Sequence, residues 1–258
     1  MQCINVSVDG GVATIKFNRP EVFNSFNRSM ALEVQGALDD FAGNEAVRCI
    51  VITGAGKAFC AGQDLNEVVD PDGPDITKIV GEHYNPIIKR LRTIAKPVIA
   101  AVNGVAAGAG ANIALACDIV VARESASFIQ AFSKIGLIPD SGGTFTLPRL
   151  VGWGRASALA ILGDKVKAHE AEQMGMIYRA VPDDEFESTV AALSSKVAGM
   201  PTMGIGYTKQ AFNESLNNTL DEQLALEEKL QHASAQTNDY NEGVTAFLEK
   251  RRPKFTGK

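Results

Sequence analysis

The chain has 258 residues, of which 45% are hydrophobic and 21% charged, with a formal net charge of −5. This length allows one large domain or one domain with an appendage, and a mildly acidic balance without basic clusters argues against nucleic acid as a partner. Cysteines and histidines show no spacing typical of a metal site or a disulfide framework, so we expect reduced thiols and no metal. They are Cys3, Cys49, Cys60, Cys117, His83, His169 and His232.

We expect neither a targeting segment nor a membrane span in this sequence. Gln2, Asn5 and Asp9 interrupt any apolar stretch at the N-terminus, which argues against a signal peptide. The long uncharged run over residues 97–117 is dominated by Ala and Gly and contains Asn112, which favours a buried strand and turn over a membrane span. We therefore expect a cytoplasmic protein without a membrane partner.

The first elements are a hairpin, a helix and a strand. Gly10 and Gly11 separate two short strands, and the second strand alternates apolar and polar residues from 13 to 18. A helix follows, because apolar residues recur at helical spacing. These are Met30, Val34, Leu38 and Phe41. Residues 49–53 then read as a buried strand that ends at Gly54.

The loop over residues 54–64 follows the carboxyl end of that strand, where α/β proteins tend to bind ligands. After a break over residues 71–74, an apolar stripe at helical spacing runs from 76 to 91. Core packing explains this stripe without a functional role.

A second buried strand over residues 97–102 leads into a turn rich in glycine and alanine. Gly108 and Gly110 permit unusual backbone angles there, and a helix should run from this turn to Cys117. Unpaired N–H groups at the start of such a helix suit a developing oxyanion. Close packing of small residues is the alternative, because the glycine spacing matches neither phosphate nor dinucleotide motifs.

Asp140 is the one carboxylate of an otherwise apolar loop, between Pro139 and Ser141. Partial burial there would raise its pKa toward the range useful for a general base. The alternative is that Asp140 is the N-cap of a helix over residues 144–150. The residues alone leave both interpretations open.

Beyond Gly143 the pattern becomes helical, with helices expected over residues 155–162 and 168–174 and three or four more between 183 and 250. Gly175 should end the second of these. The change from alternating strands and helices to helices alone predicts an α/β core over 1–195 and a C-terminal helical region over 196–258.

Three segments resemble the signature segments of the enoyl-CoA hydratase/isomerase superfamily, the crotonases. They are FCAGQDL at 59–65, NGVAAGAGA at 103–111 and GLIPDSGGT at 136–144. FNRP at 17–20 and KFTGK at 254–258 extend the resemblance over the whole chain. It implies a spiral of repeated ββα units, with the C-terminal helices used for assembly into a trimer or a dimer of trimers and for closing an acyl-CoA site.

The resemblance also implies site residues. The backbone amides of Gln63 and Ala109 correspond to the oxyanion hole, so the identity of either side chain should matter little. Hydratases of this family use two glutamates, which align with Asn112 and Phe132, and this disfavours hydration. Several isomerases carry a single acid instead, and it aligns with Asp140. Residues matched to the substrate and CoA contacts are Phe23, Ala61, Gly62, Asp64, Leu65, Gly108, Asn112, Phe132, Lys254 and Lys258.

Within the family, the chain most resembles the isomerases of phenylacetate degradation, which convert a ring-1,2-epoxide of phenylacetyl-CoA to an oxepin-CoA. The stretches that carry this likeness are GAGKAFCAGQDLNEVVDPDGP, AVNGVAAGAGANIALACDIV, FSKIGLIPDSGGT and GVTAFLEKRRPKFTGK. CoA would be part of the substrate, so we expect no cofactor. A Δ3,Δ2-enoyl-CoA isomerase, a hydratase, a thioester hydrolase and a non-catalytic scaffold are the alternatives.

Overall fold

The computed structural model describes residues 3–258, so Gln2 lies outside the described part of the chain. Strands form a six-stranded sheet in the order β1-β2-β3-β5-β7-β10 and a four-stranded sheet in the order β4-β6-β8-β9. The larger sheet contains β1 (Ile4–Asp9), β2 (Val12–Phe17), β3 (Cys49–Gly54), β5 (Val98–Val102), β7 (Ile119–Arg123) and β10 (Arg179–Val181). The smaller contains β4 (Ala58–Cys60), β6 (Val105–Ala107), β8 (Ser127–Ile129) and β9 (Lys165–Lys167).

From β3 to β8, strands that follow one another along the chain alternate between the two sheets. β3, β5 and β7 lie side by side in the larger sheet, and β4, β6 and β8, which follow them, lie side by side in the smaller one. Pairing within each of these sets is parallel. This repetition confirms the predicted α/β class and the ββα spiral.

The predicted hairpin of β1 and β2 is confirmed, with antiparallel pairing from Ile4 with Phe17 to Asp9 with Val12. On β2, Ala13, Ile15 and Phe17 are fully buried, whereas the residues between them are partly exposed or exposed. The alternation of apolar and polar residues thus sets which face of this strand meets the core.

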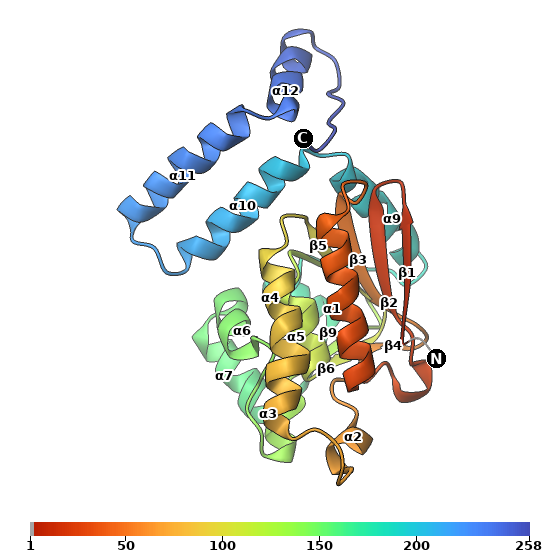
Figure 1. Ribbon diagram of the computed structural model, residues 1–258. Coiled ribbons are helices and arrows are strands. Elements are labelled where there is room, and N and C mark those ends of the chain that lie inside the picture. The colour runs from red at the N-terminus through yellow and green to blue at the C-terminus, as the bar shows by residue number, and fades with distance from the viewer. Residues whose placement is uncertain (1–2) are drawn as a thin grey trace.

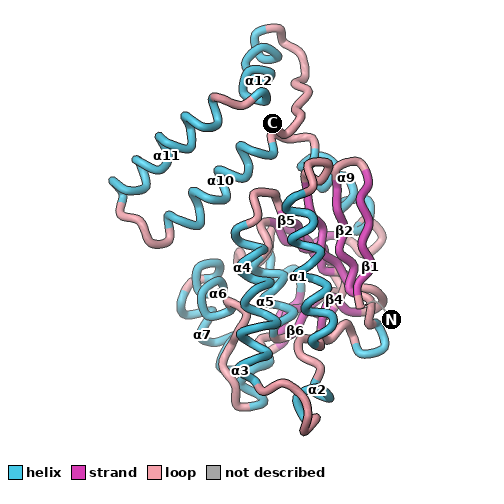
Figure 2. The backbone as a smooth tube through the Cα atoms, viewed as in Figure 1, coloured by secondary structure: helices cyan, strands magenta, loops and turns pink. Residues whose placement is uncertain are grey.

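Helices cover both faces of the larger sheet (Figures 1 and 2). Ile50 and Ile52 of β3 belong to the main core, together with α1 (Arg28–Gly43). Cys49 and Val51, which point the other way, pack with Phe186 of α9 (Phe186–Ala198). β3 is therefore buried on both faces, as its unbroken apolar sequence predicted.

The predicted helical stripe over 76–91 is one continuous segment with three parts. A short α3 (Ile76–Lys78) leads into the π-helical turn η2 (Ile79–Tyr84) and then into α4 (Asn85–Thr93). The π-helical turn was not predicted, because apolar spacing does not distinguish one wide turn within a helix. It carries Tyr84, which lies at the candidate site.

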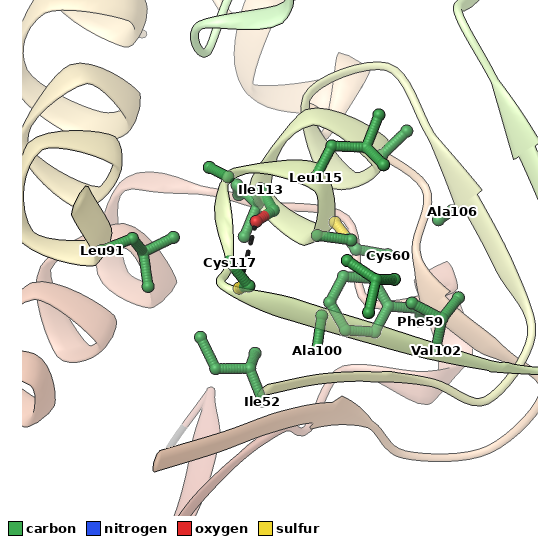
Figure 3. Packing of buried hydrophobic residues seen from close by; sticks show 14 of the residues in the cluster. Ile52, Phe59, Cys60, Leu91, Ala100, Val102, Ala106, Ile113, Leu115 and Cys117 are labelled. Carbon is green, nitrogen blue, oxygen red and sulfur yellow. Dashed lines mark hydrogen bonds between the residues drawn. The ribbon is translucent and has the colours of Figure 1, made fainter. Parts of the chain in front are cut away.

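The glycine-rich turn opens α5 (Ala109–Ala116), which ends at Cys117 as expected. All eight residues of this helix are buried. Figure 3 shows the end of α5 packed among side chains of β3, β4, α4 and β5. Gly110 allows the close approach, because a Cβ at this position would lie 2.4 Å from the Cys60 oxygen. The close packing of small residues that the sequence left open is therefore present at this turn.

The remaining helices come mostly after β8. They are η1 (Pro20–Val22), α2 (Leu65–Val69), η3 (Ala131–Ile135), α6 (Gly143–Val151), α7 (Trp153–Leu162), α8 (Ala168–Gln173), α10 (Thr202–Ser215), α11 (Leu220–Ala235) and α12 (Asn238–Leu248). Gly175 adopts a positive φ of 78° after α8, as expected of a helix stop. Helices α10 to α12 extend away from the sheets (Figure 1). Residue 195 lies inside α9, and the division into regions 1–195 and 196–258 stays a prediction.

Candidate active site

Two neighbouring backbone N–H groups, those of Gln63 and Ala109, donate to no acceptor among residues 3–258. Gln63 lies just beyond β4, and Ala109 is the first residue of α5. A Cβ built on Gly62 would lie 3.6 Å from the Ala109 nitrogen, so the loop and the helix start are in contact. Free amides at the positive end of a helix dipole suit an oxygen that gains negative charge.

The loop that carries Gln63 is fixed by its backbone. Phe26 donates its N–H to the Gly62 oxygen at 2.7 Å, and Asp64 donates its N–H to the Phe26 oxygen at 2.8 Å. Gly62 has a φ of 94°, and a Cβ there would lie 3.0 Å from the Ala107 oxygen. Only glycine meets both requirements without strain.

The side chain of Gln63, which we expected to matter little, is bound at both ends. Tyr84 donates its hydroxyl to Gln63 Oε1 at 2.8 Å, and Gln63 Nε2 donates to Glu67 Oε2 at 2.7 Å. Glu67 in turn accepts the N–H of Arg28 at 2.8 Å through its other oxygen. The side chain thus connects the oxyanion loop to η2, α2 and the start of α1.

Asp140 lies in the turn before α6, and burial raises the pKa of its carboxyl group, as predicted. Its Oδ1 accepts the Ser141 hydroxyl at 2.8 Å. The alternative role as a helix cap is wrong: the N-cap of α6 is Gly142, with a φ of 73° and no side-chain cap. Asp140 is therefore a half-buried carboxylate that the start of the helix does not use.

Asn112 lies one turn into α5, and its side chain is 1% exposed. Its Nδ2 donates to the backbone oxygen of Asp140 at 2.8 Å, and its Oδ1 accepts Gln130 Nε2 at 2.8 Å. Both ends of the amide are therefore engaged within the fold. Gln130 was missed, because no motif or spacing connects a residue after β8 with one in α5.

Phe132 and Gly108 lie against each other under the glycine turn. Phe132 is 5% exposed, and a Cβ on Gly108 would lie 3.8 Å from its Cζ. Because Asn112 and Phe132 are both uncharged, Asp140 is the only one of these three positions with a carboxylate.

Phe23, Ala61 and Leu65 form an exposed apolar rim beside Gln63. Phe23 is 54% exposed and Leu65 59%, and the Ala61 N–H donates to the Phe23 oxygen at 3.0 Å. Phe23 has a φ of 53°, an unusual value for a residue with a side chain.

The carboxylate of Asp64 is instead occupied within the fold. It accepts Arg19 Nη2 at 2.8 Å and the Asn66 N–H at 3.1 Å. Arg19 also receives support from Asn24, which is fully buried and whose Oδ1 accepts the Arg19 N–H at 2.9 Å. Arg19 and Asn24 thus stabilise the loop that carries Asp64, and of the two only Arg19 lies in the FNRP motif at 17–20.

Lys254 and Lys258 are not brought to the candidate site within one chain. Lys258 Nζ pairs with Glu45 Oε2 at 2.7 Å. Glu45 lies between α1 and β3, at the amino end of that strand, whereas Gln63 lies beyond the carboxyl end of β4. Lys254 is exposed and follows α12 in the same C-terminal segment.

Other chemistries find little support in this region. Burial raises the pKa of the Cys60 thiol to about 12, so this cysteine beside Gly62 is a poor nucleophile. Within residues 3–258, no group of three His, Cys, Asp or Glu residues is arranged to hold a metal ion. Over the same residues, no helix combines the length and the apolar character needed to cross a membrane.

The model of the family described as enoyl-CoA hydratase/isomerase matches residues 7–258. A 1,2-epoxyphenylacetyl-CoA isomerase of Escherichia coli (strain K12) is 50% identical over 261 residues, covering 100% of both chains. A protein of Rhodobacter capsulatus with the name "Probable enoyl-CoA hydratase" is 46% identical, covering 99% of this chain and 98% of that protein. The crystal structure of enoyl-CoA hydratase from Bacillus anthracis superposes with a TM-score of 0.92 at 33% identity, covering 100% of both chains.

Proposed function

Because the chain belongs to the enoyl-CoA hydratase/isomerase family, we propose that this enzyme is an isomerase that converts ring-1,2-epoxyphenylacetyl-CoA to an oxepin-CoA. The observation that carries the proposal is the single half-buried carboxyl of Asp140, in a turn whose backbone is bonded by Asn112 of α5, the helix whose first amide is unpaired. The 50% identity to a 1,2-epoxyphenylacetyl-CoA isomerase supports the substrate.

In this mechanism the thioester oxygen accepts hydrogen bonds from the Gln63 and Ala109 amides. Asp140 removes a proton from the carbon next to the thioester, and the two amides bind the resulting enolate more strongly than the neutral carbonyl. Losing one donor of this kind typically costs about 3 kcal/mol.

Asp140 then returns the proton to a carbon of the ring, while the carbon–carbon bond shared by the epoxide and the six-membered ring breaks. The ring expands to the seven-membered oxepin, and no atom is gained or lost. The raised pKa of Asp140 suits this role, because the acid must both take up and release a proton.

The second candidate function is that of a Δ3,Δ2-enoyl-CoA isomerase, which would use the same two amides and the same acid to move a double bond. Hydration is disfavoured, because Asn112 and Phe132 offer no carboxylate to activate water and the Asn112 amide is already bound. A thioester hydrolase would share the amides but would release free CoA.

We further propose that the enzyme works in the cytoplasm as a homotrimer or a dimer of trimers, without a cofactor beyond the CoA of its substrate. Exposed apolar side chains on or next to the C-terminal helices support association. They include Phe212, Leu216, Leu220, Leu224, Phe247 and Leu248. Assembly would let Lys254 and Lys258 of one subunit approach the CoA bound by another.

One experiment separates these functions. The protein is incubated with a panel of acyl-CoA thioesters that includes the phenylacetyl epoxide, and mass and ultraviolet absorbance are followed. Unchanged mass with a new spectrum on the epoxide is expected. A product heavier by one water would indicate a hydratase, and release of free CoA would indicate a hydrolase. Activity on β,γ-enoyl-CoA alone would indicate a Δ3,Δ2-enoyl-CoA isomerase. No change on any thioester would reject an enzymatic function.

A further inference from the structure

The turn that carries Asp140 depends on a buried chain of two side-chain amides. The backbone oxygen of Asp140 accepts two hydrogen bonds, from the Gly143 N–H at 2.7 Å and from Asn112 Nδ2 at 2.8 Å. The bond from Gly143 lies within the turn and closes it. The second connects the turn to α5, three residues after Ala109, on the same side of the helix.

The Asp140 carbonyl and Gln130 together determine which way the Asn112 amide points. The carbonyl can only accept, so the Asn112 nitrogen faces Asp140 and its oxygen faces Gln130, whose Nε2 donates to it. Gln130 is 4% exposed, and its Oε1 has no hydrogen-bond partner among residues 3–258. Its bond to Asn112 is thus the sole side-chain hydrogen bond of Gln130 within this range.

The backbone of the turn shows why it needs outside support. Ser141 and Gly142 both have positive φ values, 50° and 73°. Ser141 is not a glycine, so this conformation is unfavourable for it and must be held by its surroundings. Asn112 also fills the space beside the turn, since a Cβ on Gly143 would lie 2.3 Å from Asn112 Nδ2.

We propose that Asn112 and Gln130 are positioning residues, which hold the Asp140 carboxylate at a fixed place relative to the Ala109 amide. This inference rests on the proposed function, in which those two groups act on one substrate. It gives Asn112 a role other than the substrate contact that its alignment implied. Displacing a reacting group by about 1 Å can lower the rate by roughly 10²-fold, so a positioning role has a measurable size.

Two variants interrupt the chain of amides at different points. Asn112→Leu has a similar shape and loses both the bond to Asp140 and the bond to Gln130 without adding charge. Gln130→Met has a similar length and loses only the bond to Asn112. Ser127→Ala is the matched control, because Ser127 is also fully buried, lies on the same segment and has an unpaired hydroxyl that is not part of the chain of amides.

The first measurement does not depend on turnover. Hydrogen exchange of the Gly143 amide, which donates to the Asp140 oxygen, reports how firmly the turn is held. We expect faster exchange at Gly143 in Asn112→Leu and in Gln130→Met, but not in Ser127→Ala, with exchange in β3 and β5 unchanged. Unchanged exchange at Gly143 in both variants would overturn the proposal whatever the activity.

The second measurement is kinetic. We expect kcat to fall roughly 10- to 100-fold in Asn112→Leu and less in Gln130→Met, while KM changes by no more than about twofold. A wild-type kcat in variants whose turn exchanges faster would also overturn the proposal. If the wild-type protein turns over none of the thioesters, the proposed function fails, and the claim that the amides hold the turn is then decided by the exchange data alone.

Discussion

Tyr84 donates its hydroxyl to the side-chain oxygen of Gln63 at 2.8 Å, and this bond joins the π-helical turn of η2 to the loop that presents an oxyanion donor. Tyr84 is 1% exposed, and burial raises the pKa of its hydroxyl well above the usual value. The hydroxyl therefore stays protonated and remains a donor over the whole range in which the enzyme can be assayed.

Tyr84→Phe should lower kcat roughly 10-fold with little change in KM, because the Gln63 amide loses a support and not a substrate contact. The free energy of unfolding should fall by about 1 kcal/mol, the usual contribution of one hydrogen bond. Steady-state kinetics and urea denaturation measure both. Tyr178→Phe is the control, since Tyr178 is 60% exposed and should tolerate the change. Equal kinetics in Tyr84→Phe and wild type would show that the bond is dispensable.

Asp140→Asn should reduce isomerisation by roughly 10² to 10⁴ while the fold is kept, because Gly142 and not Asp140 is the N-cap of α6. In deuterated water the wild-type enzyme should exchange the proton next to the thioester, and the variant should not. Mass spectrometry of recovered substrate measures this exchange. Asp164→Asn, at an exposed position, should behave as wild type. Normal exchange in a folded Asp140→Asn protein would send the search to other polar groups.

Stability should depend on pH through Asp140 in a direction set by burial. Because the folded pKa is raised, the folded state binds this proton more tightly than the unfolded chain does. The stabilisation is complete below the unfolded pKa of about 3.9 and is lost as the pH rises through the folded pKa. Asp140→Asn should therefore have a higher Tm than wild type at neutral pH, and the difference should vanish below about pH 4. A Tm difference that does not vary with pH would argue against a buried carboxylate.

Gly110→Ala and Gly36→Ala should change stability in opposite directions. A Cβ at Gly110 would lie 2.4 Å from the Cys60 oxygen and 2.7 Å from its Sγ, so the start of α5 must move away from β4. Gly36, an exposed position in α1, has nothing within 4 Å of a built Cβ, and alanine there should stabilise the helix by about 0.5–1 kcal/mol. Thermal unfolding measures both changes, and activity should fall only in Gly110→Ala. Unchanged thermal stability in Gly110→Ala would mean that the contact between Gly110 and Cys60 is loose.

The C-terminal helices should drive self-association. Leu220 is 72% exposed and Phe247 82% exposed in one chain, which leaves apolar surface to be covered by a second copy. Light scattering at micromolar concentration should give three or six times the 27.4 kDa of one chain. Leu220→Lys combined with Phe247→Lys should shift the mass toward one chain. A monomeric wild-type protein would contradict this prediction.

The features of the fold that depend on local sequence pattern could be predicted. The alternation of β2, the apolar face of α1 and the glycine turn that opens α5 follow from spacing and residue size, and all three are confirmed. The raised pKa of Asp140 was also predicted, because an acid among apolar neighbours loses solvation.

What could not be predicted depends on contacts between distant segments. The Gln63 side chain is bound by Tyr84, twenty-one positions away, and Asn112 by Gln130, eighteen positions away. No local pattern determines which buried amide meets which hydroxyl or carbonyl, because that depends on how helices and strands dock. For the same reason, the sequence alone does not decide whether Asp140 caps a helix, and in the structure Gly142 is the N-cap of α6.

The burial of α5 has a consequence for attempts to evolve this enzyme in the laboratory. Five of its eight residues are Ala or Gly, and all eight are buried. Random mutagenesis of this helix should yield mostly inactive clones. Libraries intended to change substrate scope belong on the apolar positions that face solvent around the site, where new side chains cost little stability. These positions are Phe23, Leu65, Val69, Ile135 and Ile138.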